Sequence, residues 1–212
     1  DKMPGSYEEK FSQLKLLAGY MTAHPGKKLL FMGGELGMFS EWKDKEQLDW
    51  QLLDYESHWK LNEFFKDLLK LYKRSKPLYE LDDQPEGFEW IDVNNTNQSI
   101  FSFVRRDKSG NPLIIICNFK NIAYDCFKVG VPDKYEYKEV INSDDIKYGG
   151  SNHVNRKAIP TQDEGFHGKP YHVVVKIPPF GITVLRPIKK RKELNQNGKE
   201  KNHGNAARRG TR

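Results

Sequence analysis

The run Lys28-Leu29-Leu30-Phe31-Met32 is short and almost wholly apolar, and the glycine pair Gly33-Gly34 follows it directly. A run of this length without polar alternation is typical of a parallel β-strand that is covered on both faces. It lies between two stretches of helical periodicity, over residues 6–24 and 58–75. We therefore expect a helix, one parallel-type strand and a second helix within residues 1–78.

Both helical patterns have recognisable ends. Ser6 and Glu9 have the spacing of a capping box, and Pro25-Gly26 ends the first pattern. Basic residues precede Pro77 at the end of the second pattern, where they suit the helix dipole. The apolar positions of the two patterns are Phe11, Leu14, Leu17, Ala18 and Met21, then Leu61, Phe64, Phe65, Leu68, Leu69 and Tyr72.

A single parallel strand has no neighbour, so both of its edges would be unpaired. Parallel strands that alternate with helices are typical of a (β/α)₈ barrel, which needs about 250 residues. We therefore interpret residues 1–78 as the last helix-strand-helix portion of such a barrel. The chain also has Asp rather than Met at position 1, and we expect it to be a piece of a longer protein.

Residues 79–187 have a different pattern, in which short β-rich runs alternate with turn signals. Such spacing predicts an antiparallel sandwich that closes its own core and folds independently. Residues 143–170 are polar and are expected to form a long surface loop. The predicted strands are Gly87–Val93, Ser99–Arg105, Leu113–Phe119, Tyr124–Val129, Tyr135–Ile141, His172–Ile177 and Gly181–Leu185. The expected fold class is thus an α+β fragment.

The basic character of the chain belongs to its C-terminal tail. Residues 188–212 hold nine Lys or Arg and two Glu, so the tail has a net charge of +7. The whole chain has a net charge of +6, and residues 1–187 therefore have a net charge of −1. Few apolar residues occur in this tail, which is therefore predicted to be disordered. The preferred interpretation is a solvated extension without a partner, and the alternative is weak contact with a polyanion, without sequence specificity.

Composition excludes several classes of protein. No stretch approaches the roughly 18 consecutive apolar residues of a membrane helix. Two cysteines, Cys117 and Cys126, provide neither a disulfide framework nor a four-cysteine zinc site. The histidines lack metal-ligand spacing. We predict a cytoplasmic protein without a metal or cofactor.

Separated motifs follow one another along the chain, and they are Met3-Pro4-Gly5, residues 24–37, Glu41-Trp42, Leu48-Asp49-Trp50, Leu78-Tyr79-Glu80-Leu81-Asp82, Gly87-Phe88-Glu89-Trp90, Phe103-Val104-Arg105-Arg106-Asp107, Asn118-Phe119 and Pro178-Pro179. In these motifs and in their order, the chain resembles 1,4-α-glucan (glycogen) branching enzymes of the α-amylase superfamily. The resemblance covers residues 1–187. It implies that residues 1–78 end the catalytic barrel and that residues 79–187 form the family's C-terminal β-domain.

The resemblance also implies a reaction. Branching enzymes cut an α-1,4-glucan and transfer the segment to a 6-hydroxyl, using a carboxylate nucleophile and a second carboxyl as acid/base, as retaining glycosidases do. In the family these groups precede the Met-Pro-Gly motif, so the resemblance implies that none of the catalytic residues lies in this chain. The chain alone is expected to be inactive, with an α-glucan and the N-terminal catalytic part of the same enzyme as its partners.

Three residues are candidates for substrate binding. Glu35 directly follows the predicted strand, at the end where barrel active sites lie, and can form a wall of the glucan groove or tie down its own loop. Trp42 and Trp50 can stack on sugar rings or pack the loop against the barrel. The loop acids are interpreted as solvated side chains rather than a catalytic pair.

Two other functions remain open at this stage. One is a non-catalytic glucan-binding or structural module that acts without the barrel. The other is a nucleic-acid-binding protein whose affinity derives from the basic tail. Retardation of the chain in a glucan-containing gel would favour the first, whereas DNA binding that is lost with residues 188–212 would favour the second.

Overall fold

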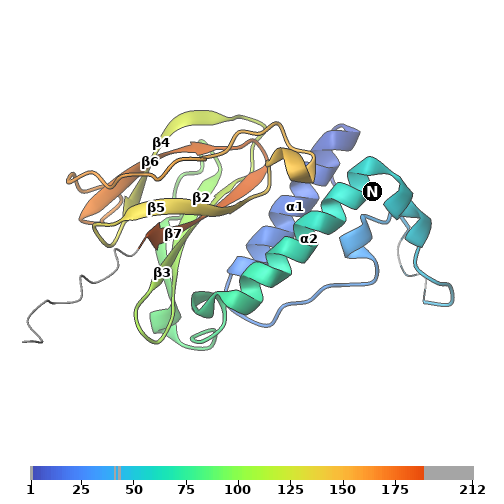
Figure 1. Cartoon of the computed structure of the whole chain (residues 1–212), viewed down its shortest axis with the longest axis horizontal. Coiled ribbons are helices and arrows are strands. Elements are labelled where there is room, and N and C mark those ends of the chain that lie inside the picture. Colours follow the sequence, from blue (N-terminus) through green and yellow to red (C-terminus); the bar gives the residue numbers. More distant parts are fainter. Residues whose placement is uncertain (1, 41, 43, 189–212) are drawn as a thin grey trace, which may run out of the picture.

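The computed structural model describes residues 2–40, 42 and 44–188. Two α-helices, α1 (Tyr7–Ala23) and α2 (Glu56–Arg74), lie against a body of seven strands (Figure 1). The expected helices are confirmed to within two residues at each end. The predicted tail, apart from Ile188, lies outside the described residues.

The N-terminus of α1 is capped as the sequence predicts. The Ser6 hydroxyl accepts a hydrogen bond from the backbone N–H of Glu9, and the Glu9 carboxylate accepts one from the backbone N–H of Ser6. Each bond satisfies an amide that the first helical turn leaves without a partner. Lys73 and Arg74 occupy the last turn of α2, where positive charge is favourable.

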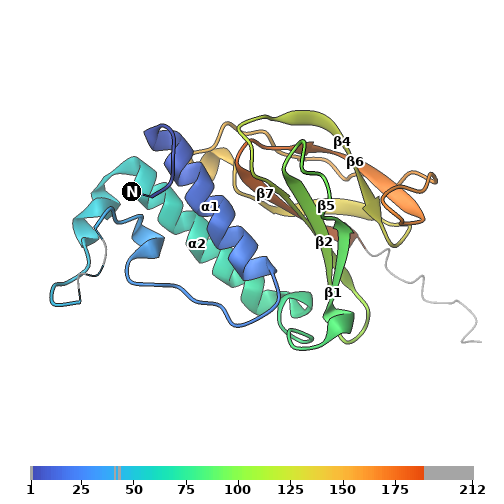
Figure 2. The same ribbon diagram turned by 180° about the vertical axis from the view of Figure 1, so that it is seen from behind.

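The two helices run side by side and in the same direction, and an extended segment connects them (Figures 1 and 2). This segment leaves the C-terminal end of α1 and returns along the pair of helices to the N-terminal end of α2. Parallel helices joined by a returning extended segment are the expected order for consecutive units of a (β/α)₈ barrel.

Residues 28–32 do not form the predicted strand. Residues 28–31 have no regular secondary structure, Met32 lies in a turn with a φ of 22°, and Leu29, Leu30 and Phe31 are 71%, 44% and 48% exposed. A strand requires backbone hydrogen bonds to a neighbour, and the described residues place no strand beside this segment. The run is apolar, but its side chains are not buried on both faces, so the prediction of a covered strand is wrong for this chain.

All seven predicted strands are confirmed, with ends that shift by a few residues. A five-stranded antiparallel sheet has the order β1-β2-β3-β7-β5, and β4 pairs with β6 in a second antiparallel sheet. The two sheets stack as a sandwich. The bounds are β1 (Phe88–Asp92), β2 (Ile100–Arg106), β3 (Pro112–Asn118), β4 (Tyr124–Val131), β5 (Glu136–Asn142), β6 (Tyr171–Ile177) and β7 (Gly181–Ile188).

The larger sheet is buried on both faces, as alternate residues of β3 show. Ile114 and Ile116 point into the core between the two sheets, with Val129 and Val173 from the smaller sheet. Ile115 belongs instead to a second core that the sheet shares with both helices. The expected sandwich core is confirmed, but the β-domain does not bury all of its apolar surface by itself. This is why β3 is apolar throughout, although it is antiparallel.

The segment 143–170 is more than a surface loop. It contains the short helix η5 (Ile146–Tyr148), and its residues Tyr148, Val154 and Ile159 are buried. Ile159 exchanges two backbone hydrogen bonds with Tyr137 of β5. Because most residues of this segment are polar, its sequence did not indicate that Tyr148, Val154 and Ile159 are buried.

Candidate functional site

The three predicted glucan contacts lie on the connection between the helices, in different environments. Glu35 is half-buried in the short helix η1 (Gly34–Leu36), whereas Trp50 begins the short helix η2 (Trp50–Asp54) and is 54% exposed. Trp42 is 72% exposed and lies edge-on to Phe31, with ring centroids 5.1 Å apart. No hydrogen bond or ring contact within the described part of the chain joins the three.

The turn that carries Glu35 is tightly held against the helices. The Leu36 side chain is fully buried, and its carbonyl oxygen lies 2.6 Å from Nδ1 of His58 in α2. The Glu35 carbonyl accepts a hydrogen bond from Nδ2 of Asn62, one turn further along α2. The backbone at Glu35 is therefore placed by α2, and its side chain projects from a fixed turn.

Glycine is required at the end of this turn. Gly37 has a φ of 66°, in the left-handed region, and a Cβ there would lie 2.9 Å from Leu61 and 3.3 Å from Phe11. Any other residue would combine backbone strain with a clash against both helices.

A shallow pocket of about 180 Å³ lies between this turn and α1. Its walls are mainly apolar, with Phe11, Met38 and Phe39 among the lining residues and Lys2 and Lys10 at its polar side. None of the three predicted glucan contacts lines it. Exposed aromatic rings are nevertheless concentrated nearby, since Tyr7, Phe39 and Tyr55 surround His58.

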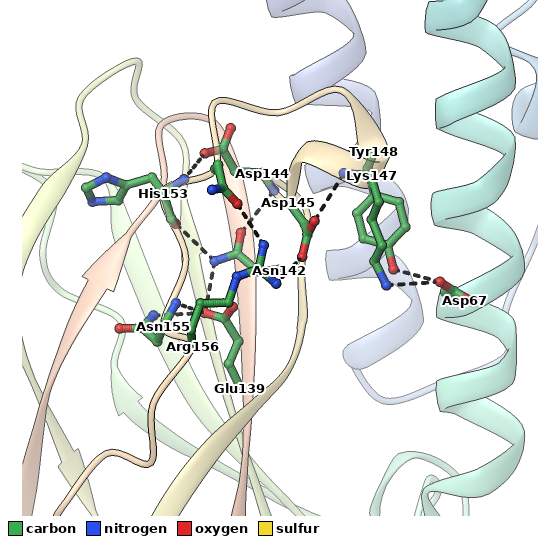
Figure 3. A network of polar contacts seen from close by, with 11 residues as sticks. Asp67, Glu139, Asn142, Asp144, Asp145, Lys147, Tyr148, His153, Asn155 and Arg156 are labelled. Atoms are coloured by element: carbon green, nitrogen blue, oxygen red, sulfur yellow. Dashed lines mark hydrogen bonds and ion pairs between the residues drawn. The ribbon is translucent and has the colours of Figure 1, made fainter.

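A second group of polar residues joins α2 to the β-domain (Figure 3). The Asp67 carboxylate accepts hydrogen bonds from the Tyr148 hydroxyl at 2.9 Å and from Nζ of Lys147 at 3.2 Å. Burial acts to raise the pKa of Asp67, but the hydrogen bonds from Lys70, Tyr148 and Lys147 outweigh it, and the pKa is lowered. This contact fixes the 142–156 loop on helix α2.

Lys15 of α1 reaches the same loop from the other helix. It is 2% exposed, and its Nζ donates to the Tyr148 carbonyl at 2.9 Å. Burial lowers the pKa of this lysine to about 8, while the nearby charge of Asp144 acts in the opposite direction. In the sequence, the only signal for Lys15 is its position four residues after Phe11, which places it on the apolar stripe of α1.

The loop itself is held by two carboxylates (Figure 3). Asp144 accepts hydrogen bonds from both the amide and hydroxyl of Ser151 and from the amide of His153. Glu139 accepts bonds from the side-chain amides of Asn142 and Asn155, and its burial raises its pKa. Because each carboxylate is already engaged by several donors, this network supports the loop rather than a reaction.

Arg105 forms the second connection between helices and sheet. Its guanidinium is fully buried and donates to the Ala23 carbonyl at the end of α1, to the Gly87 carbonyl and to the Asp82 carboxylate, at 2.7, 3.1 and 2.6 Å. The planar fork of arginine is suited to several such bonds at once. Sequence analysis placed Arg105 in a family motif but did not assign this role.

The remaining expectations concern cysteines, metals and membranes. Cys117 is buried in the core, and Cys126 is exposed. Within the described ranges, no group of three or more His, Cys, Asp or Glu side chains is arranged to hold a metal ion. The same ranges contain no helix whose length and apolar content would let it cross a bilayer.

Residues 90–188 match the family model of the alpha amylase C-terminal all-beta domain. This match begins within β1 and ends with β7, so it covers nearly the whole sandwich. The catalytic module of the pneumococcal glycogen-degrading virulence factor SpuA has a similar fold, with a TM-score of 0.58 and 15% sequence identity. That likeness covers 87% of this chain and 32% of the SpuA chain.

Curated relatives extend the similarity to the helical part. The chain is 62% identical to the 1,4-alpha-glucan branching enzyme GlgB of Bacillus caldolyticus over 94% of its length, and 54% identical to that of Bacillus mycoides over its whole length. It spans only 30% and 33% of these relatives. Since this identity extends through both the helices and the sandwich, the chain corresponds to the C-terminal portion of a 1,4-α-glucan branching enzyme.

Proposed function

We propose that this chain acts as the C-terminal portion of an enzyme that transfers α-1,4-glucan segments to 6-hydroxyls, forming the α-1,6 branches of glycogen in the cytoplasm. The observation that carries this proposal is the 62% identity with a branching enzyme over 94% of the chain. The nucleophile and the acid/base belong to the rest of the enzyme. Residues of this chain complete the structure around them.

Residues 1–78 are proposed to complete a catalytic (β/α)₈ barrel. The parallel arrangement of α1 and α2 and the returning segment between them support this assignment. So does the exposed apolar surface formed by Leu29, Leu30 and Phe31. Neighbouring barrel strands would cover this surface and pair with its backbone, which would turn residues 28–32 into the strand that the sequence predicts.

Residues 79–187 are proposed to form the separate C-terminal β-domain of the enzyme, which packs against the outside of the barrel. Arg105, Asp67 and Lys15 connect it to the two helices. These connections are buried or half-buried and come from both helices. A domain held in this way would keep the last barrel helices in a constant orientation.

Glu35, Trp42 and Trp50 are proposed to contact the α-glucan. The exposure of the two indoles supports this role, because an aromatic face that is open to solvent can stack on the apolar face of a sugar ring. The fixed turn beneath Glu35 supports a role as a wall of the groove. Binding energy from such remote contacts orients the substrate at the reacting centre.

The decisive experiment compares the chain with the complete enzyme. Incubation with amylose, followed by iodine staining and debranching analysis, should give no new α-1,6 linkages with the chain alone. A complete enzyme that contains it should produce them, and Trp42→Ala and Trp50→Ala should each raise its KM for amylose. New branches made by the chain alone would contradict the proposal, as would a complete enzyme without activity.

A non-catalytic glucan-binding module is the second candidate, and the exposure of Trp42 and Trp50 in this chain favours it. Its test is electrophoresis of the chain in a gel that contains glycogen. Retardation that Trp42→Ala and Trp50→Ala abolish would support binding without the barrel. Unchanged mobility would leave only the first proposal.

A further inference from the structure

We propose that His58 is a positioning residue, which fixes the turn Gly33–Gly37 and thereby orients Glu35 toward the glucan. The effect on catalysis rests on the proposed function. The placing of the turn is argued from the contacts of His58 itself, a buried histidine that connects α1, α2 and η1. His58 lies in the first turn of α2 and is 2% exposed.

The contacts of the ring determine its tautomer. Nδ1 lies 2.6 Å from the Leu36 carbonyl oxygen, which can only accept, so Nδ1 carries a proton and donates it. Nε2 lies 3.1 Å from the Tyr7 hydroxyl, which donates to it in the neutral imidazole. A continuous chain of hydrogen bonds thus runs from Tyr7 in α1 through His58 to the turn.

Aromatic rings surround His58 and restrict its orientation. Phe11 lies at a centroid distance of 4.9 Å with an interplanar angle of 89°, and Phe39 and Tyr55 approach edge-on at 5.9 and 6.3 Å. In such surroundings an unpaired ring nitrogen or carbonyl would be costly, because little water can replace the missing partner. The Nδ1 bond to Leu36 is therefore strongly favoured over alternative rotamers.

The turn needs this external tie because of its own composition. Gly33 and Gly37, at its two ends, both have φ values in the left-handed region, 77° and 66°. Glycine there permits the turn but leaves the backbone able to adopt many other conformations when it is not held. Backbone hydrogen bonds within the turn run from Leu36 N–H to the Gly33 carbonyl and from Gly37 N–H to the Gly34 carbonyl. Its side-chain hydrogen bonds to α2 come from His58 and from Asn62, whose bond to the Glu35 carbonyl is longer, at 3.3 Å.

Hydrogen exchange on the chain tests the structural part of the proposal. His58→Leu introduces an apolar side chain of similar size and removes the hydrogen-bond donor to the Leu36 carbonyl. His58→Asn keeps a donor, because its Nδ2 is bonded to Cγ as Nδ1 is in histidine. We expect exchange of the Leu36, Gly37 and Met38 amides to become about tenfold faster or more in His58→Leu, and to return close to the wild-type rate in His58→Asn.

A matched control is Leu68→Ala, which removes a buried side chain of the same helix from the core shared with the sheet. It should lower global stability without selectively accelerating exchange in the turn. The proposal is overturned if His58→Leu leaves exchange of the turn unchanged. It is also overturned if Leu68→Ala accelerates exchange in the turn as much as His58→Leu does.

Kinetics of the complete enzyme test the consequence for catalysis. Misplacement of Glu35 should raise KM for amylose about tenfold in His58→Leu while kcat changes by less than about threefold, and His58→Asn should largely restore KM. Leu68→Ala should leave KM unchanged. If exchange responds but KM does not, the turn is positioned by His58 as proposed, and the contact of Glu35 with glucan is wrong. If exchange of the turn and kcat change to the same extent in His58→Leu and in Leu68→Ala, the effect is general destabilisation and the positioning role is refuted.

Discussion

Lys15 and Arg105 are two buried cations that connect the helices to the β-domain, and they differ in how their charge is balanced. Arg105 faces a carboxylate and two carbonyl groups at hydrogen-bond distance. Lys15 donates to one carbonyl group and has the Asp144 charge only nearby. Burial of a charge without a close counter-ion favours the neutral form, which is why the pKa of Lys15 is lowered and its stability contribution depends on pH.

Lys15→Met should remove a pH dependence of stability. The folded-state pKa of about 8 is below the unfolded value, so between about pH 8 and 10.5 the unfolded state binds more protons and wild-type stability rises with pH. Relative to Lys15→Met, the wild-type chain should gain up to about 3 kcal/mol across this window. Urea unfolding at several pH values measures it. Lys73→Met, at an exposed position on α2, is the control, and an equal pH-dependent difference there would refute the assignment.

Arg105→Lys should destabilise the chain by about 2–4 kcal/mol, because one ammonium group cannot reproduce bonds to three partners and leaves buried acceptors unsatisfied. The neighbouring Arg106 is the matched control. It is partly exposed and pairs with Glu89, so Arg106→Lys should cost less than about 1 kcal/mol. Chemical denaturation of both variants measures the difference. Equal costs would show that the bonds of Arg105 are not specifically stabilising.

At the scale of elements, the contact between α2 and the 142–156 loop depends on Asp67 and Tyr148. Tyr148 is almost fully buried, and its ring lies edge-on to Phe64 of α2 with centroids 5.1 Å apart. Burial, together with the hydrogen bond to Asp67, raises the pKa of Tyr148, so its hydroxyl remains a donor throughout the physiological range. The loop is thus attached to the helix by packing and by a charge-assisted hydrogen bond.

A double-mutant cycle with Tyr148→Phe and Asp67→Asn should give a coupling energy of about 1–2 kcal/mol, as expected for a hydrogen bond to a charged group. Lys147 also contacts Asp67, but its side chain is 55% exposed, so Lys147→Met should couple to Asp67→Asn by less than about 0.5 kcal/mol. Equilibrium unfolding of the single and double variants provides both values. A coupling near zero between Tyr148 and Asp67 would mean that packing alone attaches the loop.

At the scale of the whole molecule, the five-stranded sheet is the centre of a three-layer arrangement. The smaller sheet covers one of its faces and the two helices cover the other. Leu17 of α1, Trp59 of α2 and Leu29 of the segment between them are exposed, and the proposed barrel would cover them. If the helical layer is removed, the apolar face of the larger sheet is exposed, and no other part of residues 79–188 covers it.

Residues 79–188 expressed alone should consequently be less stable than the same residues in the whole chain, and should bind a hydrophobic dye and self-associate. The exposed face would include Ile115, Ile182 and Val184, and Ile115→Thr and Val184→Thr should reduce the association by lowering its apolar area. Sedimentation and dye fluorescence measure these effects. A monomeric isolated domain with the thermal midpoint of the whole chain would support independent folding instead.

The sequence by itself determined both helices and all seven strands, because periodicity, capping residues and turn residues act over a few neighbouring positions. It also carried enough separated motifs to indicate the family. Tertiary structure decided the state of residues 28–32, since a strand depends on partners that local sequence does not supply. It likewise decided the roles of His58, Lys15 and Arg105, because each contacts residues that are distant in the chain. Their positions on apolar helix stripes or in a buried strand indicated that these three side chains could be buried. The role of a buried polar group, however, can be assigned only when its hydrogen-bond partner is known.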